Sequence, residues 1–360
     1  MKKIKLKDIC NISTGGTPSR SNINYWNNGD IPWCKIGDFS GKYINKVKEN
    51  ITEEGLKNSS AKIFKRGTIL YTIFATVGEV AILEKESATN QAIAGLEIIN
   101  DEVDLEYLYY YLKSLKFVML KKSRGVAQNN INLGILKNIE IKIPDKMEQI
   151  NIAKILANIE KVIDKKNKQL KELNTIIKSQ FVEMFGIPFL NDKNWKYGII
   201  KDLVREVKYG TSKPANGGKY KYLRMNNITY EGKLDLREIK YIDIEESDKE
   251  KYSTKNGDIL FNRTNSKELV GKTCVFDIEE EMIIAGFIIR VRINEFANPY
   301  FISEYMNTVY LKEKLRNMCK DASGQSNINA KELENIKIYI PPITLQNQFS
   351  EIVKQIDKQK

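Results

Sequence analysis

The sequence contains no histidine in 360 residues. This absence excludes every catalytic or metal site that requires an imidazole, including a Ser-His-Asp triad, a Cys-His pair and a histidine-ligated zinc. Cysteine is scarce too, and the 4 cysteines form no CxxC pair, so neither a zinc nor an iron–sulfur site is indicated. Because such scattered cysteines suit a reducing compartment, we expect a cytoplasmic protein with no metal site.

Long hydrophobic runs are also missing. The longest apolar stretch, residues 68–83, is too short to span a bilayer and carries Glu79. The N-terminal lysines are not followed by an apolar run, which is not the pattern of a signal peptide. We therefore expect a soluble protein with no membrane partner.

Negative charge is in deficit. The chain has 58 Lys and Arg against 46 Asp and Glu, for a formal net charge of +12. This excess favours a polyanionic partner, nucleic acid first and an acidic membrane second. A Lys-, Asn- and Ile-rich composition from an AT-rich genome would have the same charge, so charge alone leaves both interpretations open. The length suggests about two domains at ~100–200 residues each.

The most informative pattern is an internal repeat. Residues 130–132 (Asn-Ile-Asn) recur as 327–329, a shift of 327 − 130 = 197 residues. Gly67–Leu70 recurs as Gly257–Leu260. Matches of this kind follow the same order in both halves, and the shift changes slightly where loops differ in length. The chain is therefore a tandem duplication.

Both copies have the same expected order of elements. Short β-rich segments come first, followed by a helix, a polar loop and a strand that a proline ends. The elements that we predict are strand 68–72, helix 104–122 and strand 139–143 in the first copy, and strand 258–262, a helix that begins at Asn298-Pro299 and strand 336–340 in the second.

A coiled-coil pattern separates the copies. Residues 146–185 contain neither Gly nor Pro, and apolar residues recur every seven positions. Such a helix would be ~60 Å long at ~1.5 Å per residue; a long helix packed on its own domain is the alternative. The second copy begins the same helix and stops at Lys360, 382 − 360 = 22 residues before the matching end. We assign helix pairing to Ile152, Leu156, Ile159, Ile163, Leu170, Leu173, Ile177, Met184, Phe349, Ile352, Val353 and Ile356.

The order domain, helix, domain, helix resembles the specificity subunit of type I restriction–modification systems. The resemblance covers essentially the whole chain. It rests on the repeated strand-Pro-x-x-x-x-Gln-helix junction, at residues 141–149 and 338–346, on the run 257–272, and on the stretch 324–329.

The resemblance implies an α+β protein in which two homologous target recognition domains each read half of a bipartite DNA site. Its helices pair antiparallel, separate the domains and dock the modification subunits. The implied segments are recognition domain 1 (1–145), a central spacer helix (146–186), recognition domain 2 (187–342) and a short second spacer helix (343–360). A pseudo-two-fold arrangement would match the two-fold symmetry of the DNA backbones, and different loops in the copies would make the target asymmetric.

The resemblance also implies a non-catalytic subunit that binds no cofactor. Modification subunits would bring S-adenosylmethionine and methylate an adenine flipped out of the duplex. Restriction subunits with ATP-dependent translocase activity would bring ATP and Mg²⁺. The expected partners are double-stranded DNA and these two kinds of subunit.

The candidate DNA-reading residues differ between the copies. After the matched Gly-x-Ile-Leu strand the second copy has Arg263, Asn265 and Lys267, which can contact base edges or phosphates, whereas the first copy has only Thr72 and Thr76. A solvated hairpin tip would use the same residues. Further candidates come from the N-terminal loop of each copy and from a basic strip in the first. They are Thr17, Ser19, Arg20, Lys35, Lys121, Lys122 and Arg124 in the first copy, and Lys213, Lys219, Lys221 and Arg224 in the second.

The Gly/Gln/Asn loops 125–132 and 324–329 add a third set of candidates. They can bring backbone N–H groups to phosphates, or they can simply end a helix. Their candidate side chains are Gln128, Asn130, Gln325 and Asn327.

Three short motifs resemble enzyme signatures without their required context. Residues 270–273 look like the end of a P-loop, but serine stands where its first glycine belongs. Residues 298–301 resemble a methyltransferase tetrapeptide, and Asp235 with Glu238 resembles part of a nuclease triad. A self-contained DNA-modifying or DNA-cleaving enzyme is therefore one alternative, and a structural coiled-coil scaffold is the other.

Overall fold

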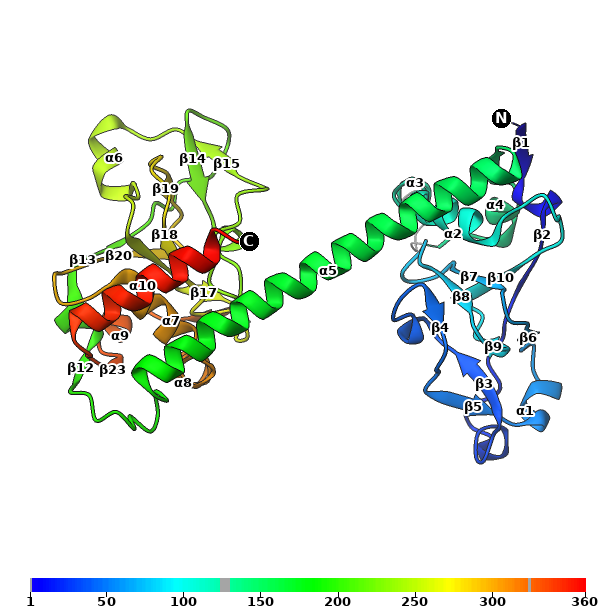
Figure 1. Ribbon diagram of the computed structural model, residues 1–360, viewed down its shortest axis with the longest axis horizontal. Helices are drawn as coiled ribbons and strands as arrows, with labels where there is room; N and C mark the ends of the chain where they lie inside the picture. Colours follow the sequence, from blue (N-terminus) through cyan, green and yellow to red (C-terminus); the bar gives the residue numbers. More distant parts are fainter. Residues whose placement is uncertain (1, 124–129, 323–324) are drawn as a thin grey trace. The chain divides into compact units, whose positions relative to one another are not determined.

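The chain forms two compact units joined by one long helix. The computed structural model (Figure 1) describes residues 2–123, 130–322 and 325–360. Unit 1 comprises Met1–Lys165 and unit 2 comprises Lys166–Lys360, with the boundary inside helix α5 (Lys146–Phe185). The predicted 40-residue central helix is confirmed, and it ends where Gly186 adopts a φ of +78°, a backbone conformation that favours glycine.

In the described residues of unit 1 the sheets have the strand orders β2-β10-β7-β8-β4, β5-β3-β9-β6 and β1-β11. Its strands are β1 (Lys2–Lys5), β2 (Cys10–Thr14), β3 (Ile31–Cys34), β4 (Tyr43–Ile44), β5 (Glu49–Ile51), β6 (Ile63–Phe64), β7 (Ile69–Thr72), β8 (Val80–Leu83), β9 (Ser87–Thr89), β10 (Ile93–Ile98) and β11 (Glu140–Ile143). Its helices before α5 are α1 (Glu53–Lys57), α2 (Leu105–Ser114), α3 (Lys116–Ser123) and α4 (Leu133–Lys137).

Unit 2 repeats this topology. Its sheets have the orders β13-β20-β16-β18, β15-β14-β19 and β12-β23, and a further small sheet has the order β17-β22-β21. Its strands are β12 (Tyr197–Ile199), β13 (Val204–Tyr209), β14 (Tyr220–Leu223), β15 (Lys240–Ile242), β16 (Asp258–Asn262), β17 (Thr264–Asn265), β18 (Thr273–Phe276), β19 (Ile283–Ile284), β20 (Ile288–Ile293), β21 (Lys320–Ala322), β22 (Gln325–Asn327) and β23 (Lys337–Tyr339). Its helices are α6 (Glu246–Tyr252), α7 (Pro299–Asn307), α8 (Val309–Met318), α9 (Ala330–Glu334) and α10 (Ile343–Asp357). The shared strand orders confirm the α+β duplication.

The single helix predicted for 104–122 is wrong in one respect, because the structure has two helices, α2 and α3, that break at Leu115. The break lets Leu112 of α2 and Met119 of α3 reach the same core. The second copy has the same break between α7 and α8, where the Thr308 hydroxyl caps α8. Asn298 caps α7 with Pro299 after it, as predicted.

A buried glutamine joins each spacer helix to its unit. The side-chain oxygen of Gln149 accepts a hydrogen bond from the Asp104 backbone N–H at 2.8 Å. Its side-chain nitrogen donates to the carbonyl oxygens of Glu102 (2.8 Å) and Pro144 (2.9 Å). The side chain therefore connects the start of α5 to the loop that leads into α2.

Gln346 makes the same three contacts in unit 2. It accepts from the Asn298 N–H at 2.9 Å and donates to the carbonyl oxygens of Phe296 (3.2 Å) and Pro341 (2.8 Å). Both glutamines are completely buried. We call these two side chains the glutamine locks, and they explain why the Pro-x-x-x-x-Gln spacing occurs twice.

Helix α10 packs antiparallel on the C-terminal part of α5 within unit 2. The Phe349 ring lies 5.5 Å from the Phe181 ring and 5.4 Å from the Phe185 ring, centroid to centroid. At the other end of α10, Lys360 Nζ donates to Asn174 Oδ1 at 2.6 Å. Contacts that advance along α10 thus retreat along α5, which confirms the antiparallel orientation.

The predicted pairing residues are buried unevenly. Leu173, Ile177, Phe349, Val353 and Ile356 are buried in the core of unit 2. Those half-buried against a core are Ile152 and Leu156 in unit 1 and Met184 and Ile352 in unit 2. In contrast, Ile159, Ile163 and Leu170 are 49%, 51% and 36% exposed, so the middle of α5 keeps an apolar face open to solvent.

Two lysines are buried in unit 2. Lys272 Nζ donates to the carbonyl oxygens of Met225 (2.7 Å) and Ile228 (2.6 Å), and Lys312 Nζ donates to that of Gly271 (2.9 Å). Burial lowers the pKa of both amines. For Lys312 the pKa falls to about 7, with a further contribution from the charge of Lys272.

The first prediction concerns the glutamine locks. We expect Gln346→Met to lower the free energy of unfolding of unit 2 by about 2–4 kcal/mol, because one N–H and two carbonyl oxygens lose their buried partner. The exposed Gln348 on the same helix is the matched control, and Gln348→Met should change stability by less than about 0.5 kcal/mol. Urea denaturation of the full chain checks both values, and equal stabilities of the two variants would refute the lock.

The second prediction concerns Lys312. Above pH ~7 the folded state releases this proton, whereas the unfolded state keeps it up to the ordinary pKa of 10.5. The stability of the native chain relative to Lys312→Met should therefore rise with pH, by up to ~1.4 kcal/mol per unit between about pH 7.5 and 9. Urea denaturation of both proteins across this range measures the difference between their free energies of unfolding. A difference that does not change with pH would contradict the prediction.

Candidate nucleic-acid interface

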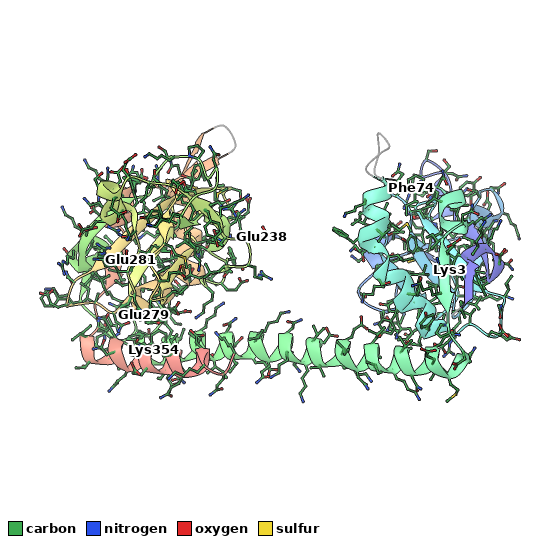
Figure 2. All side chains as sticks on the ribbon, turned by 90° about the horizontal axis from the view of Figure 1, so that it is seen from above. Lys3, Phe74, Glu238, Glu279, Glu281 and Lys354 are labelled. Carbon is green, nitrogen blue, oxygen red and sulfur yellow. The ribbon has the colours of Figure 1, made fainter. Side chains whose placement is uncertain are left out.

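Two of the candidate segments of unit 2 form one surface. Strand β17, which contains Asn265, pairs antiparallel with β22, which contains Asn327. In this register Thr264 lies opposite Asn327, and its hydroxyl donates to the Asn327 side-chain oxygen at 3.4 Å. In Figure 2, β21 and β22 lie on the side of unit 2 opposite α10. The sheet therefore brings together side chains that are about 60 residues apart in sequence.

Arg263 sits at the edge of this sheet over an aromatic ring. Its guanidinium carbon lies 4.9 Å from the centroid of the Tyr209 ring, and the Tyr209 hydroxyl accepts a hydrogen bond from the Ala330 N–H at 2.8 Å. The Arg263 backbone donates to the Phe287 carbonyl (3.0 Å) and accepts from the Ile328 N–H (2.9 Å). Both the backbone and the ring under the side chain are thus fixed.

The other candidates near Arg263 differ in their contacts and in their exposure to solvent. The Asn265 amide donates to the Asn262 side-chain oxygen at 2.9 Å, and its own oxygen accepts from the Ser266 N–H at 2.9 Å. Lys267 is exposed. Gln325 begins β22, and its backbone pairs with Ala322.

The N-terminal loop of unit 2 contributes further cations. Lys213 and Lys219 are exposed. Lys221 forms an ion pair with Glu280 at 2.6 Å. The Arg224 guanidinium donates to the carbonyl oxygen of Glu238 at 2.8 Å, and Figure 2 labels Glu238 at the edge of unit 2.

Lys35 and Arg224 occupy equivalent positions in the two units. Each follows a strand, β3 or β14, that pairs in parallel with its neighbour, β9 or β19. Each then precedes a 3₁₀ turn, and its backbone N–H donates to the side chain three residues on, Asp38 Oδ2 (2.8 Å) or Asn227 Oδ1 (2.9 Å). The sequence comparison did not match these two residues, because the loops before them differ in length.

The four N-terminal candidates of unit 1 all make polar contacts, and two of them meet at Glu49. Arg20 and Lys35 both form ion pairs with the Glu49 carboxylate. The Ser19 hydroxyl is 2.8 Å from that of Ser21, and the Thr17 hydroxyl donates to the Gln91 side-chain oxygen at 2.5 Å. The N-terminal loop of unit 1 is therefore held by polar contacts.

Thr72 is fully buried, which contradicts its prediction as a DNA-contacting residue. Its hydroxyl donates to the Thr76 carbonyl and accepts from the Glu79 N–H at 2.9 Å, so it closes the β7–β8 hairpin. Thr76 is exposed. The prediction failed because the side chain of the last strand residue points into the hairpin rather than out of it.

The sequence analysis overlooked Phe74, which is 37% exposed in the same hairpin. Figure 2 shows Phe74 on the side of unit 1 away from α5. The Ile131 N–H donates to the Ile73 carbonyl at 2.9 Å, the same contact that Ile328 makes with Arg263 in unit 2. Asn130 therefore lies next to this hairpin, as Asn327 does next to Arg263.

The remaining candidates of unit 1 belong to the basic strip. Lys121 is exposed, with its ammonium 4.8 Å from the centroid of the Phe117 ring. Lys122 lies in α3. Arg124 and Gln128 lie outside the described residues.

The enzyme-like motifs have structural roles. Lys272, in the P-loop-like stretch, is buried and occupied by backbone carbonyls, so it is not presented to a phosphate. Asn298 is a helix cap, and Asp235 pairs with Arg237. Among the described residues no group of three or more Cys, Asp or Glu side chains could hold a metal ion.

The cysteines are all free, and three of them are buried. Burial raises the pKa of the Cys10 and Cys34 thiols to about 12, so both stay protonated near neutral pH. In the parts of the chain that the structure describes, no helix is long and apolar enough to cross a membrane.

The chain thus consists of two copies of one α+β domain, each followed by a helix that a glutamine lock fixes to it. The family model described as the type I restriction modification DNA specificity domain matches residues 1–175 and 192–360. The chain therefore belongs to the specificity family of type I restriction–modification systems.

Individual relatives agree with this assignment. The MjaIX specificity subunit of Methanocaldococcus jannaschii is 36% identical over 211 residues, which cover 57% of this chain and 48% of that protein. The EcoKI specificity subunit of Escherichia coli is 26% identical over 254 residues, 66% of this chain and 54% of that one. The matched part thus spans about half the length of these relatives.

The fold agrees as well. The crystal structure of a type I S subunit from M. genitalium matches with a TM-score of 0.55 and 17% sequence identity, over 99% of this chain and 89% of that one.

Proposed function

We propose that this chain is the DNA sequence-recognition subunit of a cytoplasmic type I restriction–modification complex. Unit 1 would bind one half of a bipartite, asymmetric target and unit 2 the other. One observation carries the proposal: the two units hold matched loops with the same backbone hydrogen bonds but different side chains. Arg263 and Asn265 stand in one copy where Ile73 and Ala75 stand in the other. Equal frames with unlike side chains suit the reading of two unlike half-sites.

The charge supports DNA as the ligand. Lys35 and Arg224 occupy the same position in the two units, so each copy has a cation there. Exposed Lys213 and Lys219 lie in the same loop region of unit 2 as Arg224. Cations of this kind neutralise phosphates and fix the register of the protein on the duplex.

The helices support a role in assembly. The exposed apolar face of Ile159, Ile163 and Leu170 on α5 is the kind of surface that a partner helix covers. We assign this face to the modification subunits. The chain itself would be non-catalytic, with S-adenosylmethionine, ATP and Mg²⁺ bound by the modification and restriction subunits.

The third prediction tests the function as a whole. The chain should be co-expressed with the modification subunit of the same system, and the methylated sites should be mapped by sequencing. We expect one motif with two unlike half-sites and a spacer of fixed length. The logarithm of the DNA-binding constant of the purified complex should fall linearly with the logarithm of the salt concentration.

Two outcomes would contradict this proposal. DNA cleavage or methylation by the isolated chain with Mg²⁺ or S-adenosylmethionine would show an enzyme with its own active site. Binding without sequence preference and with weak salt dependence would instead show a structural scaffold.

The fourth prediction concerns Arg263. Arg263→Ala should relax one position of a single half-site by about 1–3 kcal/mol, because the loss of an arginine that contacts a base edge removes that discrimination. The other half-site should be read normally. Arg205, exposed at the opposite end of β13 from Tyr209, is the control, and Arg205→Ala should leave the motif unchanged. Methylation mapping that finds the native motif with Arg263→Ala would refute the assignment.

A further inference from the structure

A pair of tryptophans supports Arg20 in unit 1. The Arg20 guanidinium carbon lies 3.5 Å from the centroid of a Trp26 ring and 4.9 Å from that of Trp33. The two indoles meet edge to face, with centroids 5.0 Å apart and an interplanar angle of 85°. A guanidinium this close to an indole face is held by the ring quadrupole as well as by contact.

Both tryptophans are themselves fixed. The Trp26 ring N–H donates to the Ser19 carbonyl, and the Trp33 ring N–H donates to the Gly16 carbonyl, each at 3.0 Å. Trp33 is almost completely buried in strand β3. The aromatic surface beneath Arg20 is therefore part of the rigid frame of unit 1.

Glu49 fixes the guanidinium in a second direction. Arg20 Nη2 lies 2.6 Å from Glu49 Oε2, and Lys35 Nζ forms an ion pair with Glu49 Oε1. The hydrogen bond from Lys35 is the main cause of a lowered Glu49 pKa, so the carboxylate stays charged. Glu49 lies in β5 directly opposite Trp33 in β3, which places the carboxylate beside the aromatic pair.

This arrangement leaves most of the Arg20 fork open. The ion pair with Glu49 engages Nη2 of Arg20, and the side chain is 52% exposed. A phosphate contact requires only a cation, which a mobile lysine provides. A guanidinium held both by a ring and by a carboxylate suits the bidentate recognition of a planar edge, and guanine O6 and N7 in the major groove form the edge that arginine pairs with most often.

The arrangement of Arg20, Trp26 and Glu49 is not repeated in unit 2, so the shared fold does not require it. In unit 2, Tyr222 occupies the place of Trp33 and pairs with Lys240, which therefore stands where Glu49 stands in unit 1. A cation has thus replaced the carboxylate. Arg224, the equivalent of Lys35, donates to a backbone carbonyl instead.

We propose that Arg20 reads a guanine in the half-site bound by unit 1, and that Glu49 is a positioning residue that sets the angle of the Arg20 fork over Trp26. This inference rests on the proposed function. It adds to that function the identity of one base, guanine, and the two residues that hold Arg20 in place, Trp26 and Glu49.

The fifth prediction tests the pair in the full complex with its modification subunits. Arg20→Lys keeps the charge and removes the planar fork. It should reduce discrimination at one guanine of one half-site by about 10- to 100-fold, with the dependence of binding on salt unchanged. Glu49→Gln should reduce discrimination at the same position by a smaller factor, about 2- to 5-fold, the range of one exposed ion pair. Methylation mapping and competition binding with single-base variants of the target measure both effects.

The controls are exposed residues of unit 1 with the same chemistry. Arg66→Lys and Glu84→Gln should leave the motif unchanged. A thermal unfolding scan of each variant identifies loss of folding, and Arg20→Lys decides the question if Glu49→Gln destabilises unit 1.

Each remaining outcome overturns a defined statement. A unit 1 half-site made only of A·T pairs, or an unchanged motif with Arg20→Lys, overturns the guanine assignment and leaves the proposed function standing. Equal weakening on every sequence makes Arg20 a phosphate contact and also overturns it. If Arg20→Lys relaxes the guanine and Glu49→Gln does not, the positioning role fails. A native complex that methylates no defined motif overturns the proposed function itself.

Discussion

The arrangement of each unit depends on the glutamine lock at the start of its helix. A glutamine side chain is suited to this place because its amide has both an acceptor and two donors, and all three contacts are made in a buried site. Losing any of these contacts would leave a backbone group without a hydrogen-bond partner and away from water. The three contacts therefore fix the orientation of the helix on its unit as well as stabilise the joint. Phe349, packed between Phe181 and Phe185, adds a second constraint in unit 2.

The two copies share their backbone contacts but differ in the side chains that the matched segments carry. Ile131 and Ile328 hold the matched hairpins through the same backbone hydrogen bond, whatever side chains the hairpins carry. Even the cores have diverged. A Cβ on Gly95 would come within 2.2 Å of the Phe64 ring, whereas its counterpart Arg290 is buried and pairs with Glu206. Because backbone hydrogen bonds hold the matched hairpins in place, their side chains can differ between the copies without a change of fold.

Sequence patterns predicted the features that depend on local or periodic signals. The long helix α5, the Asn298 cap and the duplication all follow from spacing, and the structure confirms them. Features that depend on distant contacts were missed. Thr72 was misread because burial is decided by the hairpin partner, and the match between Lys35 and Arg224 became visible only through the parallel pairing of β3 and β14 with later strands. The Glu49 contact with Arg20 likewise joins residues 29 apart, on a loop and a strand that no short motif links.

The glutamine locks have a consequence for how such a gene can change. Every contact of Gln149 lies before or at the start of α5, and every contact of Gln346 lies within the second copy. Recombination between two related genes inside the region that encodes α5 would therefore deliver each copy with its own joint complete. Whole copies become exchangeable modules, and new combinations of two copies can arise in one crossover without a new folding problem to solve.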